Sequence, residues 1–409
     1  MIIPSIDLMD GKAVQLVQGR EKKLERDDVI ELAKTFRRYG EIAVIDLDAA
    51  MGRGDNIETI KEIMKVADCR VGGGIRTVER ATELLKGGAT RIIVGTAATP
   101  EFLSNFRKED VIVAIDSRKG LITDKGWQHD TGVATAKRID EVKDLCGGFL
   151  FTNVEIEGKM EGVDLEVARE IRAAVPDGMS LTVAGGITTV DEVRALEEMG
   201  ADSQIGMAVY TGALSLTEAM CAIIDFDKGG GLVPTIVQDT RGTVLMMAYS
   251  TPASLARALD TGRGTYYSRS RARLWVKGEE SGKTQELLAV RYDCDRDTLL
   301  FTVQQKGVAC HTGSYSCFGD KGFELGDLYE TLMARVASGD EGSYTYRLSK
   351  DERAIMAKIA EESQEIISYT DRANLVWEIA DITYFLLVLM ASKGIAPHEI
   401  VNELRGRRK

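Results

Sequence analysis

Apolar runs of strand length alternate with amphipathic stretches of helical period over residues 1 to about 228. Short apolar runs bounded by turn residues are typical of buried strands, and apolar residues at a spacing of three to four are typical of helices. The runs that predict strands are Ile2–Ile6, Ile42–Leu47, Val111–Ile115, Gly148–Thr152 and Leu181–Val183, and those that predict helices include Val78–Leu85 and Val190–Met199. This part of the chain is therefore predicted to repeat a strand–helix unit.

The same part contains an internal repeat. The stretch VGGGIRTVERATELLKGGA from Val71 matches VAGGITTVDEVRALEEMGA from Val183, about 110 residues later. IDLMDGK from Ile6 matches IDSRKGL from Ile115 at nearly the same offset. Two half-barrels fused into a (β/α)₈ TIM barrel explain this better than an open sheet, because such barrels usually have roughly 250 residues.

The pattern changes after the glycine run that begins at Gly229. Short alternating strands and turns follow from about Leu232 to Phe318, and from about Gly326 the chain has a helical pattern to its end. We therefore predict a multidomain protein with a TIM barrel over 1–228, a small β-rich α+β domain over 229–321 and an all-α domain over 322–409.

Composition and charge narrow the function classes. A formal charge of −12 over 409 residues argues against a general binder of nucleic acid or of anionic membranes, but small phosphorylated ligands stay possible. The opening MIIPSIDLMD lacks the features of a signal peptide, and the most apolar run, Ile382–Ala391, is too short to cross a bilayer. We expect a cytoplasmic protein. Six cysteines are too sparse for a disulfide framework, which leaves free thiols or metal ligands.

Glycines and acidic residues occur where the barrel strands are predicted to end. Glycine there lets backbone N–H groups approach phosphate oxygens, although tight turns explain a single copy equally well. Two copies in symmetric positions favour a ligand with a phosphate at each end. Asp7 and Asp116 close equivalent strands and suit a general acid–base pair, with a capping role as the alternative. The phosphate-binding candidates are Gly73, Gly74, Gly95, Gly185, Gly186 and Gly206.

The motifs IIPSIDLMDGKAVQLVQG, VIDLDAA, VGGGIR, VAIDSRKG with KGW, and AGGITT resemble the phosphoribosylformimino-aminoimidazole-carboxamide ribotide isomerase family over residues 1–226. The resemblance implies a cofactor-free Amadori rearrangement with Asp7 as the base. Where the family usually reads TDISRDG, with its second aspartate as the acid, this chain reads TNVEIEG and has Glu157. Asp116 is the alternative acid. An activity on phosphoribosylanthranilate, which some relatives have, stays open.

In the middle part, YDCDRDTLLF alternates three aspartates with other residues between apolar flanks that predict a strand. In a strand the three carboxylates would share one face and Cys294 would point the other way, which suggests a bound cation. The stretches PTIVQDTRGTVLMMAYS, YYSRSRARLWVKGEESG, DCDRDTLL and ACHTGSYSCF resemble phosphoribosyl-AMP cyclohydrolase nearly end to end.

That resemblance implies two metals. The three alternating aspartates would bind Mg²⁺, and three cysteines would bind Zn²⁺, which could lower the pKa of a water for attack on the purine ring. The implied ligands are Asp293, Asp295 and Asp297 for Mg²⁺, and Cys294, Cys310 and Cys317 for Zn²⁺. His311 is a candidate proton acceptor or a hydrogen bonder of the site. Arg269, Arg271 and Lys277 could meet the phosphates, with a solvated strand face as the alternative.

The helical part carries a cluster of five carboxylates. Glu361, Glu362 and Glu365 precede Glu378 and Asp381, and a short connection predicts that their two helices are antiparallel neighbours. An exposed helix charge is the alternative for Glu361. The pattern resembles the all-α nucleotide pyrophosphohydrolases and points to phosphoribosyl-ATP pyrophosphohydrolase, which implies bound Mg²⁺. The chain departs from that family at Phe385, where histidine is usual, and at Ala360, where glycine is usual.

The three implied reactions are consecutive steps of histidine biosynthesis, in the reverse of chain order. Pyrophosphate would leave phosphoribosyl-ATP, the adenine ring of phosphoribosyl-AMP would open, and the aminoaldose product would isomerise to an aminoketose. The rival hypothesis is a scaffold that binds metal and nucleotide and in which one module is degenerate. Relatives of the last two modules are typically dimers, which implies a homodimer held by the C-terminal half.

Overall fold

The computed structural model describes residues 1–19, 21–124, 127, 129–319 and 322–407. The chain forms two compact units, Met1–Asp320 and Lys321–Arg408. The expected boundary at 321/322 falls beside residues 320 and 321, which lie outside the described part, as do Lys125 and Gly126 of the KGW motif. The expected boundary at 228/229 stays a prediction.

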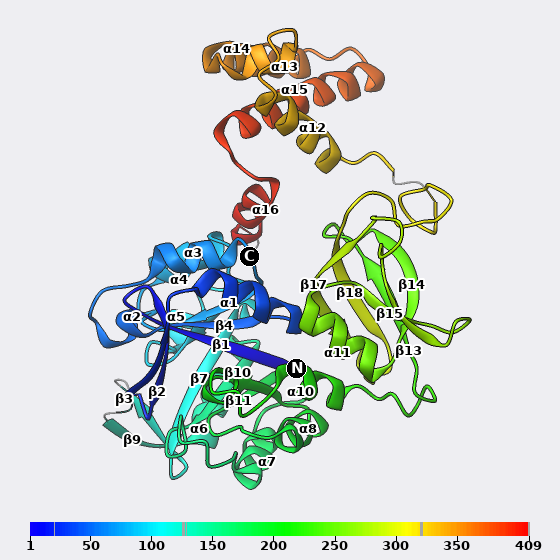
Figure 1. Cartoon of the computed structure of the whole chain (residues 1–409). Coiled ribbons are helices and arrows are strands. Elements are labelled where there is room, and N and C mark those ends of the chain that lie inside the picture. Colours follow the sequence, from blue (N-terminus) through cyan, green and yellow to red (C-terminus); the bar gives the residue numbers. More distant parts are fainter. Residues whose placement is uncertain (20, 125–126, 128, 320–321, 408–409) are drawn as a thin grey trace. The chain divides into compact units, whose positions relative to one another are not determined.

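Eight parallel strands close into a barrel in the first unit (Figure 1). The closing contact is the parallel pairing of β7 with β10, in which Ile115 lies opposite Phe151. The TIM barrel expected from the repeat is confirmed. In barrel order the strands are β1 (Ile2–Met9), β4 (Ile42–Asp46), β5 (Cys69–Gly72), β6 (Arg91–Val94), β7 (Val111–Arg118), β10 (Gly148–Asn153), β11 (Ser180–Ala184) and β12 (Asp202–Ile205).

Amphipathic helices cover the outside of the barrel. The predicted helices at Val78 and Val190 both begin after a threonine whose hydroxyl accepts a hydrogen bond from the third helical N–H. The helices are α1 (Val29–Phe36), α2 (Leu47–Met51), α3 (Ile57–Met64), α4 (Val78–Lys86), α5 (Pro100–Leu103), α6 (Thr135–Val142), α7 (Leu165–Ala174), α8 (Val190–Glu198), α9 (Met207–Tyr210) and α10 (Leu216–Ile223), with 3-10 turns η1 (Arg37–Tyr39), η2 (Lys108–Asp110) and η3 (Lys143–Leu145).

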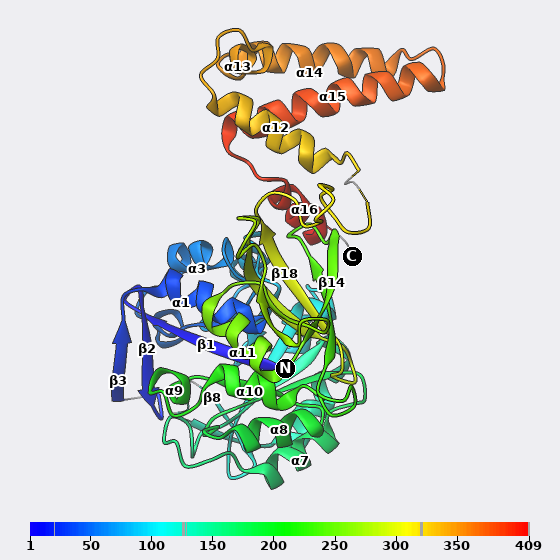
Figure 2. The same ribbon diagram turned by 45° about the vertical axis from the view of Figure 1, so that its right-hand side comes forward.

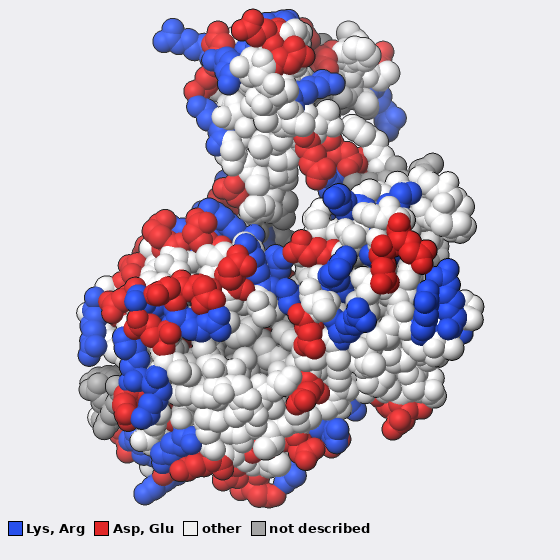
Figure 3. Space-filling model, viewed as in Figure 1, with Lys and Arg blue, Asp and Glu red and all other residues white. Residues whose placement is uncertain are grey.

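Two hairpins extend from the barrel strands beyond the closed wall. One follows β1 and consists of β2 (Lys12–Val17) and β3 (Glu21–Arg26), and the other follows β7 and consists of β8 (Leu121–Asp124) and β9 (His129–Ala134). Acidic and basic side chains are interspersed over the face of the barrel shown in Figure 3.

A buried ion pair lies near the N-terminal ends of the barrel strands. The Arg70 side chain is 1% exposed, and its guanidinium donates to Glu41, which precedes β4. It also donates to the Thr182 hydroxyl of β11 at 2.8 Å. Because β5 and β11 are not neighbours in the barrel, Arg70 reaches across its interior.

Glu41→Gln is expected to lower the free energy of unfolding of the first unit by about 3–5 kcal/mol, because it leaves the Arg70 charge buried without a counter-ion. Urea denaturation followed by circular dichroism measures this. The control is Glu58→Gln, whose carboxylate pairs with Lys61 on the surface and should cost at most about 1 kcal/mol. Equal, small losses in both variants would contradict the assignment.

A six-stranded sheet forms the rest of the first unit, in the order β16-β15-β14-β13-β18-β17. It is β-rich with one described α-helix, as predicted. Its elements are β13 (Val233–Gln238), β14 (Val244–Ser250), α11 (Pro252–Thr261), β15 (Thr265–Ser268), β16 (Arg273–Val276), β17 (Gln285–Tyr292) and β18 (Leu299–Gln305).

The strand expected through the three aspartates is wrong. Residues 293–298 form the turn between β17 and β18. Arg296 has a φ of +62°, which a regular strand does not allow. The Asp293 carboxylate accepts hydrogen bonds from the backbone N–H groups of Asp297 and Thr298 at 3.0 and 3.1 Å, and so stabilises the turn from inside.

The barrel and the six-stranded sheet share one apolar core. The buried cluster runs without a break from barrel residues such as Ile223 to Leu255 and Leu259 of α11. At its edge the Tyr39 and Thr217 hydroxyls are 2.8 Å apart, and Thr217 donates to the Asp260 carboxylate. The shared core explains why these two modules form one compact unit.

The second unit is helical, as predicted. The expected antiparallel pair is present, since α14 and α15 lie side by side in Figures 1 and 2. α15 is long and apolar enough to span a membrane by length and composition alone, although it carries two acidic residues of the predicted cluster. The helices are α12 (Leu325–Ala337), α13 (Tyr344–Ser349), α14 (Glu352–Ile367), α15 (Arg372–Lys393) and α16 (Pro397–Gly406).

Candidate functional site

A cavity of about 1150 Å³ opens at the C-terminal ends of the barrel strands. This is the end at which TIM-barrel enzymes carry their active sites. The cavity is lined by all three predicted carboxyl residues and all six predicted glycines, namely Asp7, Asp116, Glu157, Gly73, Gly74, Gly95, Gly185, Gly186 and Gly206. The structure therefore brings together every site residue predicted for this module.

The three carboxyl groups come from different parts of the wall. Asp7 lies in β1, Asp116 in β7, and Glu157 follows β10. Burial raises the pKa of Asp7 to about 6, although a hydrogen bond from Ser5 opposes the shift. Burial also raises the pKa of Asp116, while hydrogen bonds from Trp127 and Thr152 oppose it.

Glu157 has the most strongly shifted pKa of the three. Burial is the largest cause, and the charges of Asp7 and Asp116 add to it, raising the pKa to about 8. Its Oε2 atom is buried and has no hydrogen-bond partner within the described residues. These shifts keep Glu157 protonated to a higher pH than Asp7, and a pair of carboxyl groups with separated pKa values is the arrangement that acid–base catalysis needs.

Only glycine fits at the two strand-end loops. Gly73 has a φ of +92°, and a Cβ there would lie 2.2 Å from the Asp46 carbonyl oxygen. At Gly186, with a φ of +79°, a Cβ would lie 2.4 Å from the Gly162 carbonyl oxygen. The backbone is therefore packed closely against neighbouring loops at both ends of the cavity, where phosphate groups could be held by N–H groups.

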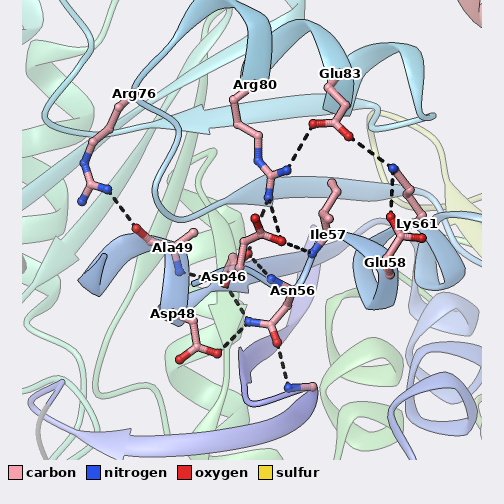
Figure 4. Close-up of polar contacts among 12 residues, drawn as sticks. Asp46, Asp48, Ala49, Asn56, Ile57, Glu58, Lys61, Arg76, Arg80 and Glu83 are labelled. Carbon is pink, nitrogen blue, oxygen red and sulfur yellow. Dashed lines mark hydrogen bonds and ion pairs between the residues drawn. The ribbon is translucent and has the colours of Figure 1, made fainter. Parts of the chain in front are cut away.

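A buried polar network supports the Gly73 loop (Figure 4). The Asn56 amide donates to the Asp46 and Asp48 carboxylates at 2.7 and 3.0 Å, and its oxygen accepts from Gly11 N at 2.7 Å. The Arg76 guanidinium, just after the glycine loop, donates to the Ala49 carbonyl oxygen at 2.9 Å. The network connects this loop to the turn after β1, the strand that carries Asp7.

Sequence reasoning missed two glutamines of the cavity. Gln15 is 3% exposed. Its Nε2 atom and the Oε1 atom of Gln204 are buried without hydrogen-bond partners among the described residues. Both residues line the cavity, so their amides are available to a ligand. An uncharged glutamine within a strand belongs to no recognisable motif. Only the order of apolar and polar residues in VQLVQ, residues 14–18, could have indicated that Gln15 points into the barrel.

The three aspartates of the β17–β18 turn converge despite the change of secondary structure. Carboxylate oxygens of Asp293, Asp295 and Asp297 lie within 4.8 Å of one another. The Lys228 ammonium contacts Asp295 and lies 2.6 Å from Asp297. This set of oxygen atoms fits a hard cation such as Mg²⁺.

The predicted zinc thiols are only partly brought together. Cys310 and Cys317 contact each other, and a hydrogen bond with Thr312 lowers the pKa of the Cys310 thiol, whereas burial raises that of Cys317. Among the described residues the three sulfur atoms do not come within 4.8 Å of one another as a set, because Cys294 is exposed in the aspartate turn. His311 is exposed, with Nδ1 4.0 Å from the Cys310 sulfur.

The three predicted phosphate-binding cations lie in different surroundings. Lys277 is 9% exposed and donates to the Ala309 carbonyl oxygen at 2.8 Å, next to Cys310 in the sequence. Burial lowers its pKa. Arg269 and Arg271 are exposed, and the Arg269 guanidinium stacks 4.0 Å above the Tyr249 ring.

In the helical unit, three of the five predicted carboxylates converge. Glu362 of α14 and Glu378 and Asp381 of α15 have oxygens within 4.8 Å of one another. The Glu362 Oε2 atom is buried without a hydrogen-bond partner among the described residues, and burial followed by the Asp381 charge raises the Glu362 pKa. Such a buried, mutually repelling set fits a divalent cation.

The other two carboxylates differ from each other. A hydrogen bond with Glu378 raises the pKa of Glu365, which places Glu365 at the edge of the cluster. Glu361 is exposed and pairs with Lys358 at 2.7 Å. The structure therefore groups Glu365 with the cluster and leaves Glu361 outside it.

Three family profiles match the chain in order. They are "Histidine biosynthesis protein" over residues 1–215, "Phosphoribosyl-AMP cyclohydrolase" over 246–319 and "Phosphoribosyl-ATP pyrophosphohydrolase" over 325–408. The first match covers the barrel and the cavity residues. The other two cover the aspartate–cysteine region and the helical carboxylates.

Individual relatives agree with these matches. The chain is 38% identical to the phosphoribosyl imidazole-4-carboxamide isomerase of Methanocaldococcus jannaschii, over 54% of this chain and 98% of that protein. It is 41% identical to the histidine biosynthesis bifunctional protein HisIE of Pyrococcus furiosus, over 47% and 99%. A histidine biosynthesis trifunctional protein of Neurospora crassa is 41% identical over 81% of this chain, which spans 36% of that relative.

Proposed function

Because the chain belongs to the histidine biosynthesis protein family and also contains cyclohydrolase and pyrophosphohydrolase domains, we propose that it catalyses three consecutive steps of histidine biosynthesis. The helical unit removes pyrophosphate from phosphoribosyl-ATP. The six-stranded sheet opens the adenine ring of phosphoribosyl-AMP, and the barrel isomerises the aminoaldose product. The substrates are small phosphorylated nucleotides. The observation that carries the proposal is the ordered match of all three domains.

In the barrel, Asp7 acts as base and Glu157 as acid. With a pKa of about 6, Asp7 is mostly ionised at neutral pH and can accept a proton from the sugar carbon. With a pKa of about 8, Glu157 is mostly protonated and can donate to the ring oxygen as the ring opens. Burial brings both pKa values near neutral pH, and the Glu157 side chain lines the cavity.

The loops at Gly73 and Gly186 hold the two phosphate groups of the substrate, one at each end of the cavity. The unpaired amide of Gln15 lies beside Gly206, where a Cβ would be 2.7 Å from its Oε1 atom. The M. jannaschii relative is named for the imidazole-carboxamide reaction. The bifunctional and trifunctional relatives are likewise named for histidine biosynthesis, which supports the aminoaldose of that pathway as the substrate of the barrel.

The cyclohydrolase domain uses metal ions, and we assign Mg²⁺ to the aspartates and Zn²⁺ to the cysteines. The converging carboxylate oxygens suit the hard cation, and the thiols suit the soft one. When bound, zinc supplies an activated water for opening the purine ring. His311, 4.0 Å from the Cys310 sulfur, can take up a proton beside that position, and Lys277 fixes the loop through Ala309.

A homodimer would complete the zinc site. Cys310 and Cys317 contact each other while Cys294 is exposed elsewhere in the same chain, so a second copy is the natural source of the third thiolate. The helical unit also has an exposed apolar face on α15, formed by Val376, Trp377, Ile379 and Leu386, which are 44–69% exposed. A second copy covering this face would bury it.

Cys310→Ser and Cys294→Ser are each expected to lower zinc content and stop ring opening, because a hydroxyl is a poor substitute for a thiolate. Co-expression of these two variants should recover about a quarter of wild-type activity, since half of the dimers are mixed and each has one intact site. Metal analysis and a ring-opening assay measure both effects.

The control is co-expression of Cys310→Ser with Cys317→Ser. Both cysteines of this pair come from the same copy, so no mixed dimer has an intact site. No recovery in the first mixture would contradict the shared site. Full zinc occupancy with normal activity in all single variants would contradict the zinc assignment itself.

In the helical unit, Glu362, Glu378, Asp381 and Glu365 are the proposed Mg²⁺ ligands. A cation held by these residues would supply Lewis-acid stabilisation of the charge on the polyphosphate and activation of water for its hydrolysis. Phe385, which departs from the family pattern, is 7% exposed in the helical core and packs edge-on to Tyr384, with ring centroids 5.3 Å apart. The phenylalanine is thus part of the apolar core, and Glu362, Glu378 and Asp381 converge with phenylalanine at this position.

The direct test incubates the pure chain with phosphoribosyl-ATP, Mg²⁺ and Zn²⁺ and follows each intermediate by chromatography. We expect all three conversions in this assay. We also propose that the enzyme is cytoplasmic. A scaffold with one degenerate module would stop at the substrate of that module, even though its metal content is normal.

A further inference from the structure

Lys228, in the segment between the barrel and the six-stranded sheet, contacts the proposed magnesium site. The Lys228 ammonium contacts the Asp295 carboxylate and lies 2.6 Å from an oxygen of Asp297. Lys228 precedes β13, whereas the aspartates follow β17, and 67 positions separate Lys228 from Asp295. A positive charge from the end of the barrel module is thus placed on the aspartate cluster of the next module.

The backbone around Lys228 is anchored. Lys228 N donates to the Asp225 carboxylate at 3.1 Å, and Asp225 N donates to the Arg296 carbonyl oxygen of the aspartate turn at 2.8 Å. Phe226 is 7% exposed in the core that the barrel and sheet share. These contacts hold the lysine backbone against the turn, while its side chain, 47% exposed, is free to swing into solvent.

The ammonium and a divalent metal require the same atoms. An ammonium has three donors and needs carboxylate lone pairs to accept them. Mg²⁺ binds carboxylate oxygens at about 2.0–2.1 Å in a strict octahedral geometry. The oxygens that Lys228 occupies belong to two of the three proposed ligands, so both cations cannot bind them together at full strength.

We propose that Lys228 is the internal counter-cation of the aspartate cluster, and that a divalent metal binds there by displacing its ammonium from Asp295 and Asp297. This inference rests on the proposed Mg²⁺ site. It makes the end of the barrel module a determinant of metal affinity in the cyclohydrolase. It also gives the turn a bound positive charge that offsets carboxylate repulsion before metal arrives.

The test is calorimetric titration of Mg²⁺ into metal-stripped full-length protein carrying Glu362→Gln and Asp381→Asn, which remove the helical site. In this background Lys228→Met is expected to bind Mg²⁺ roughly three- to tenfold more tightly, because Mg²⁺ no longer has to break the two exposed ion pairs that Lys228 makes with Asp295 and Asp297. Lys228→Arg, which keeps the charge, should stay within about twofold of the lysine form on the same grounds.

The matched control is Lys143→Met, which removes an exposed lysine paired with Asp140 in the barrel and should leave Mg²⁺ affinity unchanged. Equal affinity of the Lys228→Met and lysine forms would overturn the inference alone. Absence of any Mg²⁺ binding in both forms would overturn the metal assignment as well. Loss of the titration in an added Asp295→Asn variant is expected, because it places the measured binding at this cluster.

Discussion

Glu157→Gln and Asp7→Asn should each lower the isomerase kcat by at least roughly a hundredfold, the lower end of what general acid–base catalysis contributes. Glutamine cannot donate the proton that the ring oxygen needs, and asparagine cannot accept the one from the sugar carbon. Substrate affinity should change little, because the phosphate loops are untouched. Steady-state kinetics with the purified aminoaldose measures kcat and KM separately.

The pH profile gives a second, independent readout. Asp7 must be ionised to act as a base, so activity should rise with pH through about 6. Glu157 must be protonated to act as an acid, so activity should fall as pH passes about 8. The residual activity of Glu157→Gln should lose the alkaline limb and keep the acidic one.

Two further variants decide the assignment. Glu155→Gln alters a neighbouring carboxylate that accepts from Lys119 N outside the main cavity, and it should leave kcat near normal. Asp116→Asn tests the alternative acid. Near-normal kcat in Glu157→Gln together with a large loss in Asp116→Asn would transfer the acid role to Asp116.

Glu362→Gln or Asp381→Asn should abolish pyrophosphate release from phosphoribosyl-ATP. Each variant removes a charged ligand from the proposed Mg²⁺ site. The loss of activity should therefore exceed the factor of about 10–100 that is typical when a residue that only hydrogen-bonds to a metal ligand is replaced. Ring opening, started from phosphoribosyl-AMP, and isomerisation should persist, because the helical cluster lies in a separate compact unit.

The matched control is Glu352→Gln, which alters an exposed carboxylate of the same helix paired with Lys393 and should leave pyrophosphate release unchanged. Glu361→Gln tests whether that exposed residue is a ligand, as its motif position suggests. Normal pyrophosphate release in both Glu362→Gln and Asp381→Asn would show that the metal assignment is wrong.

The fold was predictable where the chain repeats one local pattern. The periodicity around Val78 and Val190 and the duplicated glycine loops predicted the helices and the closed barrel, because each follows from neighbours in the sequence. The turn at Asp293 was not predictable in this way. An acidic residue at every second position has the period of a strand. The Asp293 carboxylate nevertheless accepts hydrogen bonds from the backbone N–H groups of Asp297 and Thr298, which closes the segment into a turn, and the turn still brings the carboxylates together.

Candidate site residues were likewise predictable where a local motif contains them and were missed elsewhere. Carboxylates and strand-end glycines stand out in a motif, so the cavity set was found from sequence. Asn56 was missed because its role depends on partners distant in the chain, such as Gly11 N, which donates to its amide oxygen. Gln15 was missed because an uncharged glutamine in a strand belongs to no motif. Spacing alone also gave no sign that Cys294 is separated from the Cys310–Cys317 pair.

The apolar cluster that runs from the barrel into α11 has a genetic consequence. A substitution that weakens packing near Ile223 or Leu259 perturbs a core on which two enzymatic steps depend. Such a lesion would block isomerisation and ring opening together, although it touches neither set of reacting residues. A comparable lesion around Leu332 or Val388 in the helical core would block pyrophosphate removal alone, and adding phosphoribosyl-AMP to a cell extract would bypass it.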